Sequence, residues 1–317
     1  MRLVLWAKGT RGAACLERLV RAERRPTLVV LQPSMRPGAP CPVEALARTH
    51  AIPTIAPHDP HDAATLARLA EQQADVFVLA GYGKILRAEV FDLPRRMTIN
   101  THAGRLPQMR GSSPLNWALL TDQREFSLSV IRVDAGVDRG DVLAERSFAI
   151  CDDDDIRDLH RVANEHFPEM ILEVLDAIES DTLAPRRQDD AAARYYPLRF
   201  PDDGLVLWDQ LTARQAHNRI RALRPPYPGA FTFFEHRRVD LIASQLARDD
   251  VRGEPGRIYR IRDDALLVCA RDRCLWIREA VFADDGRPLR EYVRRYDRLA
   301  TAQAAACAYY TRRGALC

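Results

Sequence analysis

The sequence predicts an α/β protein with a Rossmann-like N-terminal domain and a smaller C-terminal β domain. In the first half, continuous apolar runs such as LVLWA (3–7) and DVFVLA (75–80) alternate with segments of helical periodicity. In the last third, short strand-like runs follow one another between Gly, Pro and Asp residues. The first pattern is typical of a parallel sheet with helices on both faces, and the second of a small β-barrel or sheet.

The elements of the first half can be placed in order from these patterns. Runs of Val, Leu and Ile favour strands, whereas apolar residues three and four apart favour helices. Strands are expected at 3–7, 27–32, 75–80, 96–100, 126–134 and 141–150, and helices at 12–22, 42–50, 64–73 and about 153–180. Because such sheets bind ligands outside the carboxyl ends of their strands, we expect the functional site at that edge.

The second half begins with a stretch that is rich in Pro, Asp and Arg and lacks periodicity, which predicts a linker along the surface. A helix is expected at 211–223, followed by strands that form an OB-like β-barrel and by a helical tail over 288–314. The predicted domains are a catalytic domain at 1–182, a linker at 183–210 and a β-rich domain with a helical tail at 211–317.

The composition is that of an ordinary globular protein, because 47% of its 317 residues are hydrophobic and 29% are charged. No apolar run approaches the roughly 18 residues that cross a bilayer, and the apolar stretch at the N-terminus is too short for a signal peptide. The seven cysteines are scattered without a CxxC pair, which favours reduced thiols over a disulfide framework or a zinc ribbon. We therefore expect a cytoplasmic protein without a membrane partner.

Charge and motifs argue against several classes of ligand. The net charge is +3, and residues 226–317 carry 17 basic and 13 acidic groups, a surplus too small to favour a nucleic-acid surface. The first turn, GTRGAA (9–14), lacks the GxGxxG spacing of dinucleotide sites, and no GxxxxGK[ST] motif occurs. HDPHD (58–62) is expected to be a surface loop, and no metal is predicted.

Asn100 and His102 stand two residues apart at the end of an expected strand, where a buried strand would favour Val or Ile. Residues two apart on a strand project to the same face, so an amide and an imidazole share one small volume at the carboxyl edge. An amide N–H can hold an oxyanion, and an imidazole can exchange a proton near neutral pH. Capping of a loop is the competing structural explanation.

The turn VDAGVDRGDVLAE (133–145) places Asp134, Asp138 and Asp141 between two expected strands. A carboxylate in this turn could reach the end of a neighbouring strand, accept a proton and orient the histidine. Asp and Gly also serve the geometry of a solvated hairpin. Both interpretations stay open on the turn alone.

The stretch INTHAGRLPQMRGSSPLNWAL (99–119), together with this turn, resembles the folate-dependent formyltransferases. Their site combines an Asn-x-His pair, a Leu-Pro and Arg-Gly loop, and an Asp from a D-x-G-x-D-x-G-D segment. The resemblance implies that Asn100, His102 and Asp138 are catalytic. It also implies transfer of a formyl group from 10-formyltetrahydrofolate to an amine. It covers about residues 1–240, including the junction into the C-terminal β domain, and then fades.

The resemblance also implies residues that bind the two substrates. LAGYGKIL (79–86) is similar to the folate loop of the family, in which backbone groups hold the pterin-like ring. The implied cofactor-binding residues are Tyr82, Gly83, Lys84, Ile85, Leu86 and Asp134. The implied acceptor-binding residues are Arg110, Gly111, Arg199 and Trp208, although Trp208 also fits a core tryptophan and Arg199 an exposed loop residue. One departure is that Ala103, Gly104, Arg105 and Leu106 replace the usual x-Ser-Leu-Leu after the histidine.

The acceptor is inferred from a later segment, RYYPLRFPDDGLVLWDQL (194–211), which resembles sugar formyltransferases, notably the domain that acts on UDP-4-amino-4-deoxyarabinose. There an arginine meets the nucleotide, which makes Arg199 the candidate. The tRNA formyltransferases are of similar length and also end in a β-barrel. However, they carry a lysine-rich insertion where this chain has the short QPSMRPGAPCPVEAL (32–46). We therefore expect a nucleotide-linked amino sugar.

Several alternatives stay open. Initiator methionyl-tRNA and a small amino acid such as hydroxyornithine are the other acceptors. A formyltetrahydrofolate hydrolase would use the same three residues on water, but such enzymes usually carry a regulatory domain before the first strand. A noncatalytic binding protein would not need all three residues. The sequence leaves the identity of the sugar, the role of the tail and a possible homo-oligomer undecided.

Overall fold

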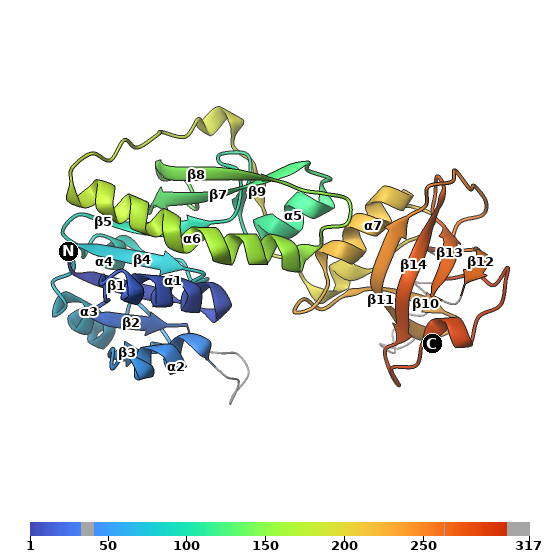
Figure 1. Cartoon of the computed structure of the whole chain (residues 1–317), viewed down its shortest axis with the longest axis horizontal. Helices are drawn as coiled ribbons and strands as arrows, with labels where there is room; N and C mark the ends of the chain where they lie inside the picture. Colours follow the sequence, from blue (N-terminus) through green and yellow to red (C-terminus); the bar gives the residue numbers. More distant parts are fainter. Residues whose placement is uncertain (33–40, 263, 303–317) are drawn as a thin grey trace. The chain divides into compact units, whose positions relative to one another are not determined.

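The computed structural model describes residues 1–32, 41–262 and 264–302, and the chain forms two compact units. Unit 1 consists of Met1–Pro114, Glu125–Ala149 and His160–Pro197. Unit 2 consists of Leu115–Arg124, Ile150–Leu159 and the chain from Leu198 onward. Each unit has its own sheet (Figure 1).

The sheet of unit 1 has, among the described residues, seven strands in the order β3-β2-β1-β4-β5-β7-β8. The five neighbouring strands from β3 to β5 pair in parallel. By contrast, β7 pairs antiparallel with β5, and β8 pairs antiparallel with β7. The expected parallel sheet is therefore a mixed one. The bounds are β1 (Leu3–Ala7), β2 (Leu28–Leu31), β3 (Thr54–Ile55), β4 (Val76–Ala80), β5 (Met97–His102), β7 (Glu125–Arg132) and β8 (Val142–Ala149).

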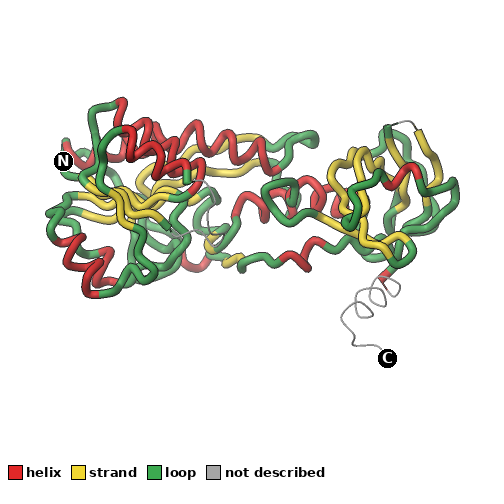
Figure 2. Tube along the Cα trace, turned by 90° about the horizontal axis from the view of Figure 1, so that it is seen from below, coloured by secondary structure: helices red, strands yellow, loops and turns green. Residues whose placement is uncertain are grey.

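Helices cover this sheet on both faces, as expected from its continuous apolar strands (Figure 2). Every residue of β1, β2 and β4 is buried. The four predicted helices begin and end within three residues of their predicted bounds because the apolar spacing follows the buried face, whereas the short helix α4 was not predicted. Their bounds are α1 (Gly9–Arg21), α2 (Pro42–Thr49), α3 (Ala63–Ala70), α4 (Ala88–Phe91) and α6 (Ile156–Glu179).

The strand order places a ligand site at the carboxyl edge of the sheet. The order reverses between β1 and β4, and open α/β sheets bind ligands where this reversal leaves a crevice. The segment after β4 contains the predicted folate loop, and β5 lies next to β4. The strand predicted at 96–100 continues to His102, so Asn100 and His102 belong to one strand.

The predicted linker is partly built into unit 1. Its first part contains the 3-10 turn η1 (Asp190–Ala192) and the short strand β9 (Tyr195–Tyr196). Strand β9 pairs in parallel with β6 (Arg110–Gly111), which follows the Asn-x-His strand. Residues up to Pro197 therefore pack with unit 1, whereas the 3-10 turn η2 (Pro201–Gly204) belongs to unit 2.

Unit 2 contains a five-stranded antiparallel sheet in the order β10-β11-β14-β13-β12. This confirms the predicted β domain, but no pairing in the described chain joins β10 to β12 and closes a barrel. The helices of this part are α5 (Pro114–Leu120) and α7 (Ala213–Ala222). The strands are β10 (Ala230–Phe234), β11 (Arg237–Leu246), β12 (Ile258–Arg262), β13 (Ala265–Cys269) and β14 (Cys274–Phe282).

The helical tail predicted from Pro288 is wrong for its described part. Between Pro288 and Thr301 only the 3-10 turn η3 (Leu289–Glu291) is helical. The backbone N–H groups that a helix would use bind the sheet instead, because Tyr296 donates to Ile258 and Leu299 donates to Gly256. The predicted tail beyond Ala302 lies outside the described residues, as does most of the 32–46 loop. No helix in the described ranges is long and apolar enough to cross a membrane.

Candidate active site

Asn100 lies on β5 with its side chain uncommitted. In register it faces Leu79 of β4 and Ile131 of β7, and it is partly exposed. Its amide has no hydrogen-bond partner in the described part of the chain. A polar side chain on a central strand without an internal partner is free to bind a substrate, which does not fit the competing explanation of loop capping.

His102 is buried, with 5% of its surface exposed, and both ring nitrogens face an oxygen. The Nε2 atom lies 2.6 Å from the carbonyl oxygen of Met109. Because a carbonyl only accepts hydrogen bonds, Nε2 carries a hydrogen. The Nδ1 atom lies 3.5 Å from Oδ2 of Asp138. In the neutral ring Nδ1 is therefore the basic nitrogen, and a proton taken there would lie beside a carboxylate.

Asp138 reaches His102 from the turn between β7 and β8. Ile99 pairs with Arg132, so the turn starts beside the first half of β5 and folds back toward His102. Asp138 adopts a left-handed backbone conformation with φ of 50°, which Asp tolerates better than most residues. Its Oδ2 accepts a hydrogen bond of 2.9 Å from the N–H of Gly111. The structure thus brings together the histidine and the carboxylate that the sequence placed 36 positions apart.

Arg110 and Gly111 are packed inside the protein. Only 1% of Arg110 is exposed, and its guanidinium donates to three side chains: to Gln188 Oε1 at 3.0 Å, to the Tyr195 hydroxyl at 3.0 Å and to Asp190 Oδ1 at 2.9 Å. The predicted acceptor contact of Arg110 is not supported, because its nitrogens are already used. Gly111 has φ of 100° and lies so near Tyr196 that a Cβ would be 2.3 Å from its carbonyl oxygen, so only glycine fits.

The departure after the histidine has a steric reason. A Cβ on Gly104, which replaces the serine of the family pattern, would lie 2.7 Å from His102 Nε2 and 2.8 Å from the Met109 oxygen. The absent side chain therefore allows the bond between these two groups. Arg105 does not add a cation to the site, because it forms an ion pair of 2.6 Å with Glu125.

The predicted folate loop is largely anchored to unit 1. Tyr82 and Leu86 belong to the core, and Tyr82 packs edge-on against Trp6. Burial raises the pKa of Tyr82 to about 12, and its buried hydroxyl has no partner in the described chain. Gly83 donates its N–H to Gln32 at 2.7 Å, and Lys84 binds the carbonyl oxygens of Pro57 and His58. Ile85 is exposed, at 73%.

A hollow of about 490 Å³ lies beside the turn that carries Asp138. One wall is α4, which follows the folate loop, and the other is the turn itself. Asp134 lines the hollow, and its carboxylate accepts the N–H of Gly136 at 2.8 Å. The hollow therefore lies between the turn with Asp134 and the helix that follows the predicted folate loop, whereas Tyr82 to Leu86 are not among its lining residues.

The other two predicted residues, Arg199 and Trp208, belong to unit 2. Arg199 is partly buried, lies 5.1 Å over the ring of Trp117 and donates to the carbonyl of Asp203. Burial lowers its pKa, and its Nε is buried without a partner in the described chain. Trp208 is completely buried and donates to Thr232 at 2.9 Å. Trp208 is therefore a core tryptophan, which was the alternative interpretation, and its stacking on a base is not supported.

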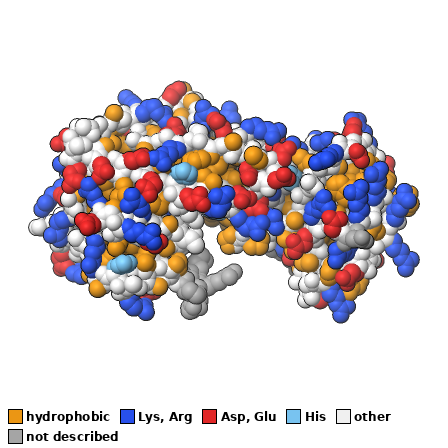
Figure 3. All heavy atoms as spheres, viewed as in Figure 1, with side chains coloured by type: hydrophobic (Ala, Val, Ile, Leu, Met, Phe, Trp, Pro, Cys, Tyr) orange, Lys and Arg blue, Asp and Glu red, His pale blue; other side chains and the backbone are white. Residues whose placement is uncertain are grey.

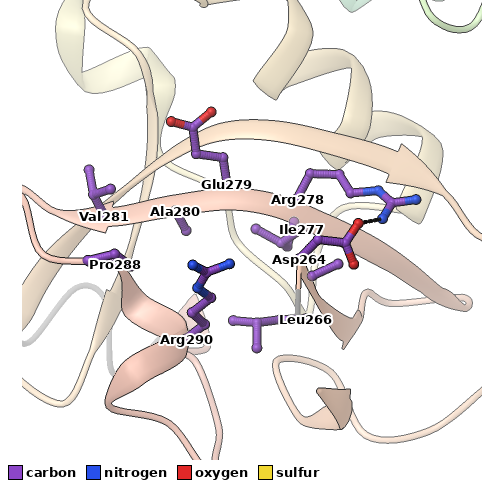
Figure 4. Close-up of a pocket in the computed structure, with 10 residues that line it drawn as sticks. Asp264, Leu266, Ile277, Arg278, Glu279, Ala280, Val281, Pro288 and Arg290 are labelled. Atoms are coloured by element: carbon purple, nitrogen blue, oxygen red, sulfur yellow. Dashed lines mark hydrogen bonds and ion pairs between the residues drawn. The ribbon is translucent and has the colours of Figure 1, made fainter. Parts of the chain in front are cut away.

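A second hollow, of about 240 Å³, lies on the sheet of unit 2 (Figure 4). Its apolar lining includes Leu266, Ile277 and Ala280, and Arg278 forms an ion pair with Asp264 at its side. No histidine or cysteine is among its described lining residues.

The described residues contain no group of three or more His, Cys, Asp or Glu side chains arranged to hold a metal. In the HDPHD loop, His61 is occupied on both nitrogens, by Asp59 and by the N–H of Arg87.

The family is established by comparison with known proteins. Residues 14–175 match the formyl transferase family model, and residues 200–290 match the formyl transferase C-terminal domain model. The chain is 34% identical over 278 residues to a methionyl-tRNA formyltransferase of Geobacter metallireducens, covering 86% of this chain and 88% of that protein. The chain therefore belongs to the formyltransferase family. The predicted enzyme class, a formyltransferase, is confirmed at the level of the family.

Solved structures support the same fold. A Helicobacter canadensis N-formyltransferase, in complex with folinic acid and dTDP-3-aminofucose, aligns with a TM-score of 0.68 at 16% identity, covering 88% of this chain and 99% of that one. HypX of Aquifex aeolicus in complex with tetrahydrofolic acid aligns with a TM-score of 0.63 at 19% identity, covering 90% of this chain and 44% of that one. At such identities these likenesses show the fold alone.

Sequence reasoning missed three groups around the predicted catalytic residues: the Met109 carbonyl, Gly104 and Gln188. A backbone carbonyl leaves no trace in a sequence. Gly104 was visible as a departure from the family pattern, but its reason is a steric contact. Gln188 lies in a stretch without periodicity, so no local signal marked it.

Proposed function

We propose that this enzyme transfers a formyl group from 10-formyltetrahydrofolate to a primary amine by means of Asn100, His102 and Asp138. The observation that carries the proposal is the distance of 3.5 Å between His102 Nδ1 and an Asp138 carboxylate that Gly111 holds in place. Together with the uncommitted amide of Asn100, this supplies an oxyanion donor, a proton carrier and a group that orients it.

Each residue has a stated task in the transfer. As the amine nitrogen bonds to the formyl carbon, Asn100 donates its N–H to the carbonyl oxygen, where negative charge develops. His102 takes the proton that the amine loses, at Nδ1, and Asp138 stabilises the resulting imidazolium. The bond between the formyl carbon and the donor nitrogen then breaks, and His102 returns the proton to that nitrogen.

The residues around the 490 Å³ hollow fit a bound tetrahydrofolate. The hollow is bounded by α4 and by the turn that contains Asp134. Tyr82 does not line the hollow, although its buried hydroxyl has no partner among the described residues and stays protonated near neutral pH. The support for a bound tetrahydrofolate is therefore the position of the hollow, between the helix that follows the predicted folate loop and the turn with Asp134.

For the acceptor, we favour the α-amine of initiator methionyl-tRNA. The relatives at up to 34% identity are named methionyl-tRNA formyltransferases, and their similarity extends through both domains. This preference differs from the nucleotide-linked amino sugar that the sequence pattern favoured. The sugar stays the second candidate.

The second candidate rests on the surroundings of Arg199. Arg199 and Arg219 are close enough that the charge of Arg199 contributes, after burial, to lowering the pKa of Arg219. Neither guanidinium forms a salt bridge within the described ranges, and both have a buried Nε without a partner. Two incompletely paired cations suit a diphosphate. On the face shown in Figure 3, by contrast, cationic and anionic side chains are interspersed, which does not favour a long nucleic-acid track.

The test is a panel of acceptors assayed with 10-formyltetrahydrofolate by release of tetrahydrofolate. The panel comprises charged initiator tRNA, UDP-, dTDP- and GDP-linked amino sugars, and hydroxyornithine, with Asp138→Ala as the inactive control. We expect turnover with the charged tRNA and none with uncharged tRNA. Turnover with a nucleotide sugar alone would replace the favoured acceptor with the second candidate, and turnover without any amine would indicate a hydrolase.

A further inference from the structure

Gln188 is a buried polar residue, 6% exposed, in the stretch that the sequence placed in a surface linker. Its Oε1 accepts a hydrogen bond of 3.0 Å from Nε of Arg110. Its Nε2 donates two, of 2.9 Å to the carbonyl of Asp138 and of 2.7 Å to the carbonyl of Gly140. The amide therefore uses both hydrogens of its nitrogen and connects a buried arginine to the turn that carries the catalytic carboxylate.

The orientation of this amide is fixed by its partners. The Nε of Arg110 can only donate, and the two carbonyls can only accept. Rotating the amide by half a turn would place donor against donor on one side and acceptor against acceptors on the other. Gln188 thus has one arrangement in which all its polar atoms are satisfied. With no polar atom left over, it is not a ligand contact for the hollow that it helps to line.

The backbone of Asp138 needs such support. Its φ of 50° is disfavoured for a residue with a side chain, and conformations of this kind persist only where the surroundings impose them. The turn is tight as well, because a Cβ on Gly140 would lie 1.8 Å from the carbonyl oxygen of Arg132. Gln188 holds the carbonyl of Asp138, while Gly111 holds its carboxylate.

Arg110 anchors Gln188 in turn. The guanidinium is bound by Asp190 and by the hydroxyl of Tyr195, both on the same stretch as Gln188. Arg110 also precedes Gly111 directly, so one short strand supplies both the anchor for Gln188 and the N–H that holds the Asp138 carboxylate. The strand Arg110–Gly111 therefore supports both contacts of Asp138. Gly111 binds its carboxylate directly, and Arg110 anchors the glutamine that binds its backbone carbonyl.

We propose that Gln188 is a positioning residue, which acts through Asp138 to set the distance between its carboxylate and Nδ1 of His102. The inference rests on the proposed function, in which Asp138 stabilises the protonated histidine. Without the amide, the turn relaxes toward an ordinary backbone conformation and the carboxylate moves away from the imidazole. Misplacement of a reacting group by about 1 Å can cost about 10²-fold in rate.

The first test compares Gln188→Ala and Gln188→Glu with Arg186→Ala. Arg186 lies on the same stretch, but its side chain binds Glu145 and is half exposed, so it serves as the matched control. We expect both Gln188 variants to lose roughly 10- to 100-fold in kcat, with KM for donor and acceptor within about threefold. Glu keeps the size of Gln and can still accept from Arg110, but it cannot donate to the two carbonyls. It therefore keeps the proposal testable if the Ala variant fails to fold.

The second test is a double-mutant cycle with Asp138→Ala, measured on kcat. If Gln188 acts through Asp138, Gln188→Ala causes no further loss of kcat once the carboxylate is gone. Wild-type kcat in both Gln188 variants, or an undiminished loss in the Asp138→Ala background, would overturn the proposal. Failure of the proposed function looks different, because Asp138→Ala itself would then keep near wild-type turnover.

Discussion

Arg110 and Arg199 lie in two regions that the sequence assigned to the acceptor, and the structure gives their guanidinium groups opposite surroundings. Arg110 is 1% exposed and donates to Gln188, Tyr195 and Asp190. Arg199 donates to one backbone carbonyl, lies over the ring of Trp117 and keeps a buried Nε without a described partner. An arginine in a predicted binding motif can therefore serve the fold instead, and the two cases differ in how many guanidinium nitrogens the protein itself uses.

The largest effect is expected in the region that Arg110 supports. Asn100→Ala should lower kcat about 10²–10³-fold, because it removes an oxyanion donor, and Asp138→Ala should cause a loss of similar size. Steady-state rates of tetrahydrofolate release, with circular dichroism to confirm folding, provide the measurement. A well-folded Asp138→Ala enzyme with near wild-type turnover would refute the assigned role.

Arg110→Met tests, through the free energy of unfolding, whether Arg110 serves the fold. The buried Oε1 of Gln188 would lose its donor, which typically costs about 1–3 kcal/mol, whereas half-exposed Asp190 regains water. We expect a loss of unfolding free energy of roughly 2 kcal/mol in urea, accompanied by reduced kcat. Unchanged stability with a raised KM for the acceptor would instead restore the substrate contact predicted from the sequence.

Gly104→Ser restores the residue of the family pattern and probes how tightly the region is packed. The added Cβ would lie 2.7 Å from His102 Nε2, so the ring or the Met109 carbonyl must move. Overpacking of this kind costs about 1–3 kcal/mol of unfolding free energy. We also expect a clear loss of kcat, because the ring that moves is the proposed proton carrier. Gly136→Ser is the steric comparison, because its added Cβ would lie 2.8 Å from Cδ and 2.9 Å from Cβ of Arg139, so that Arg139 must shift instead of His102. Equal kcat in the Gly104 variant and the wild type would contradict this packing.

Arg199→Met is the counterpart of Arg110→Met in the other region. It removes a partly buried cation that has no salt bridge in the described chain, so we expect the unfolding free energy to change by less than about 1 kcal/mol. KM for a nucleotide-sugar acceptor should rise if that candidate is correct, and KM for charged tRNA should stay within about threefold. The KM values of this variant therefore distinguish the two candidate acceptors.

The smallest expected effect is on thermal stability at acidic pH, through Asp190. Hydrogen bonding by the Arg110 guanidinium, aided by Arg139, lowers the pKa of Asp190 below its ordinary value of 3.8. A carboxyl with a lowered pKa stabilises the fold above its unfolded pKa, and this contribution is lost as the pH falls through the folded pKa. We expect a small extra loss of thermal stability below about pH 4 that Asp190→Asn no longer shows. An identical slope of Tm against pH in both proteins would argue against it.

The sequence predicted most elements of unit 1 because its strands are continuous apolar runs and its helices have a clear buried face. The predicted tail failed for a different reason. Its spacing fits a helix, but the N–H groups of Tyr296 and Leu299 bind the neighbouring strand region, and tertiary hydrogen bonds override local propensity. The antiparallel pairing of β7 also had no local signal, since strand direction is a matter of chain topology.

By itself, the sequence placed Asn100 and His102 on one face of a strand and a carboxylate in the turn with Asp138, which was enough to predict the candidate residues. Only the tertiary structure decided that the turn folds back toward β5. It also decided that all three guanidinium nitrogens of Arg110 bind side chains of the protein, and that Gln188 donates hydrogen bonds to the turn. The physical reason is distance along the chain. These contacts join residues 27 to 80 positions apart, and side-chain hydrogen bonds of that range have no periodicity to reveal them.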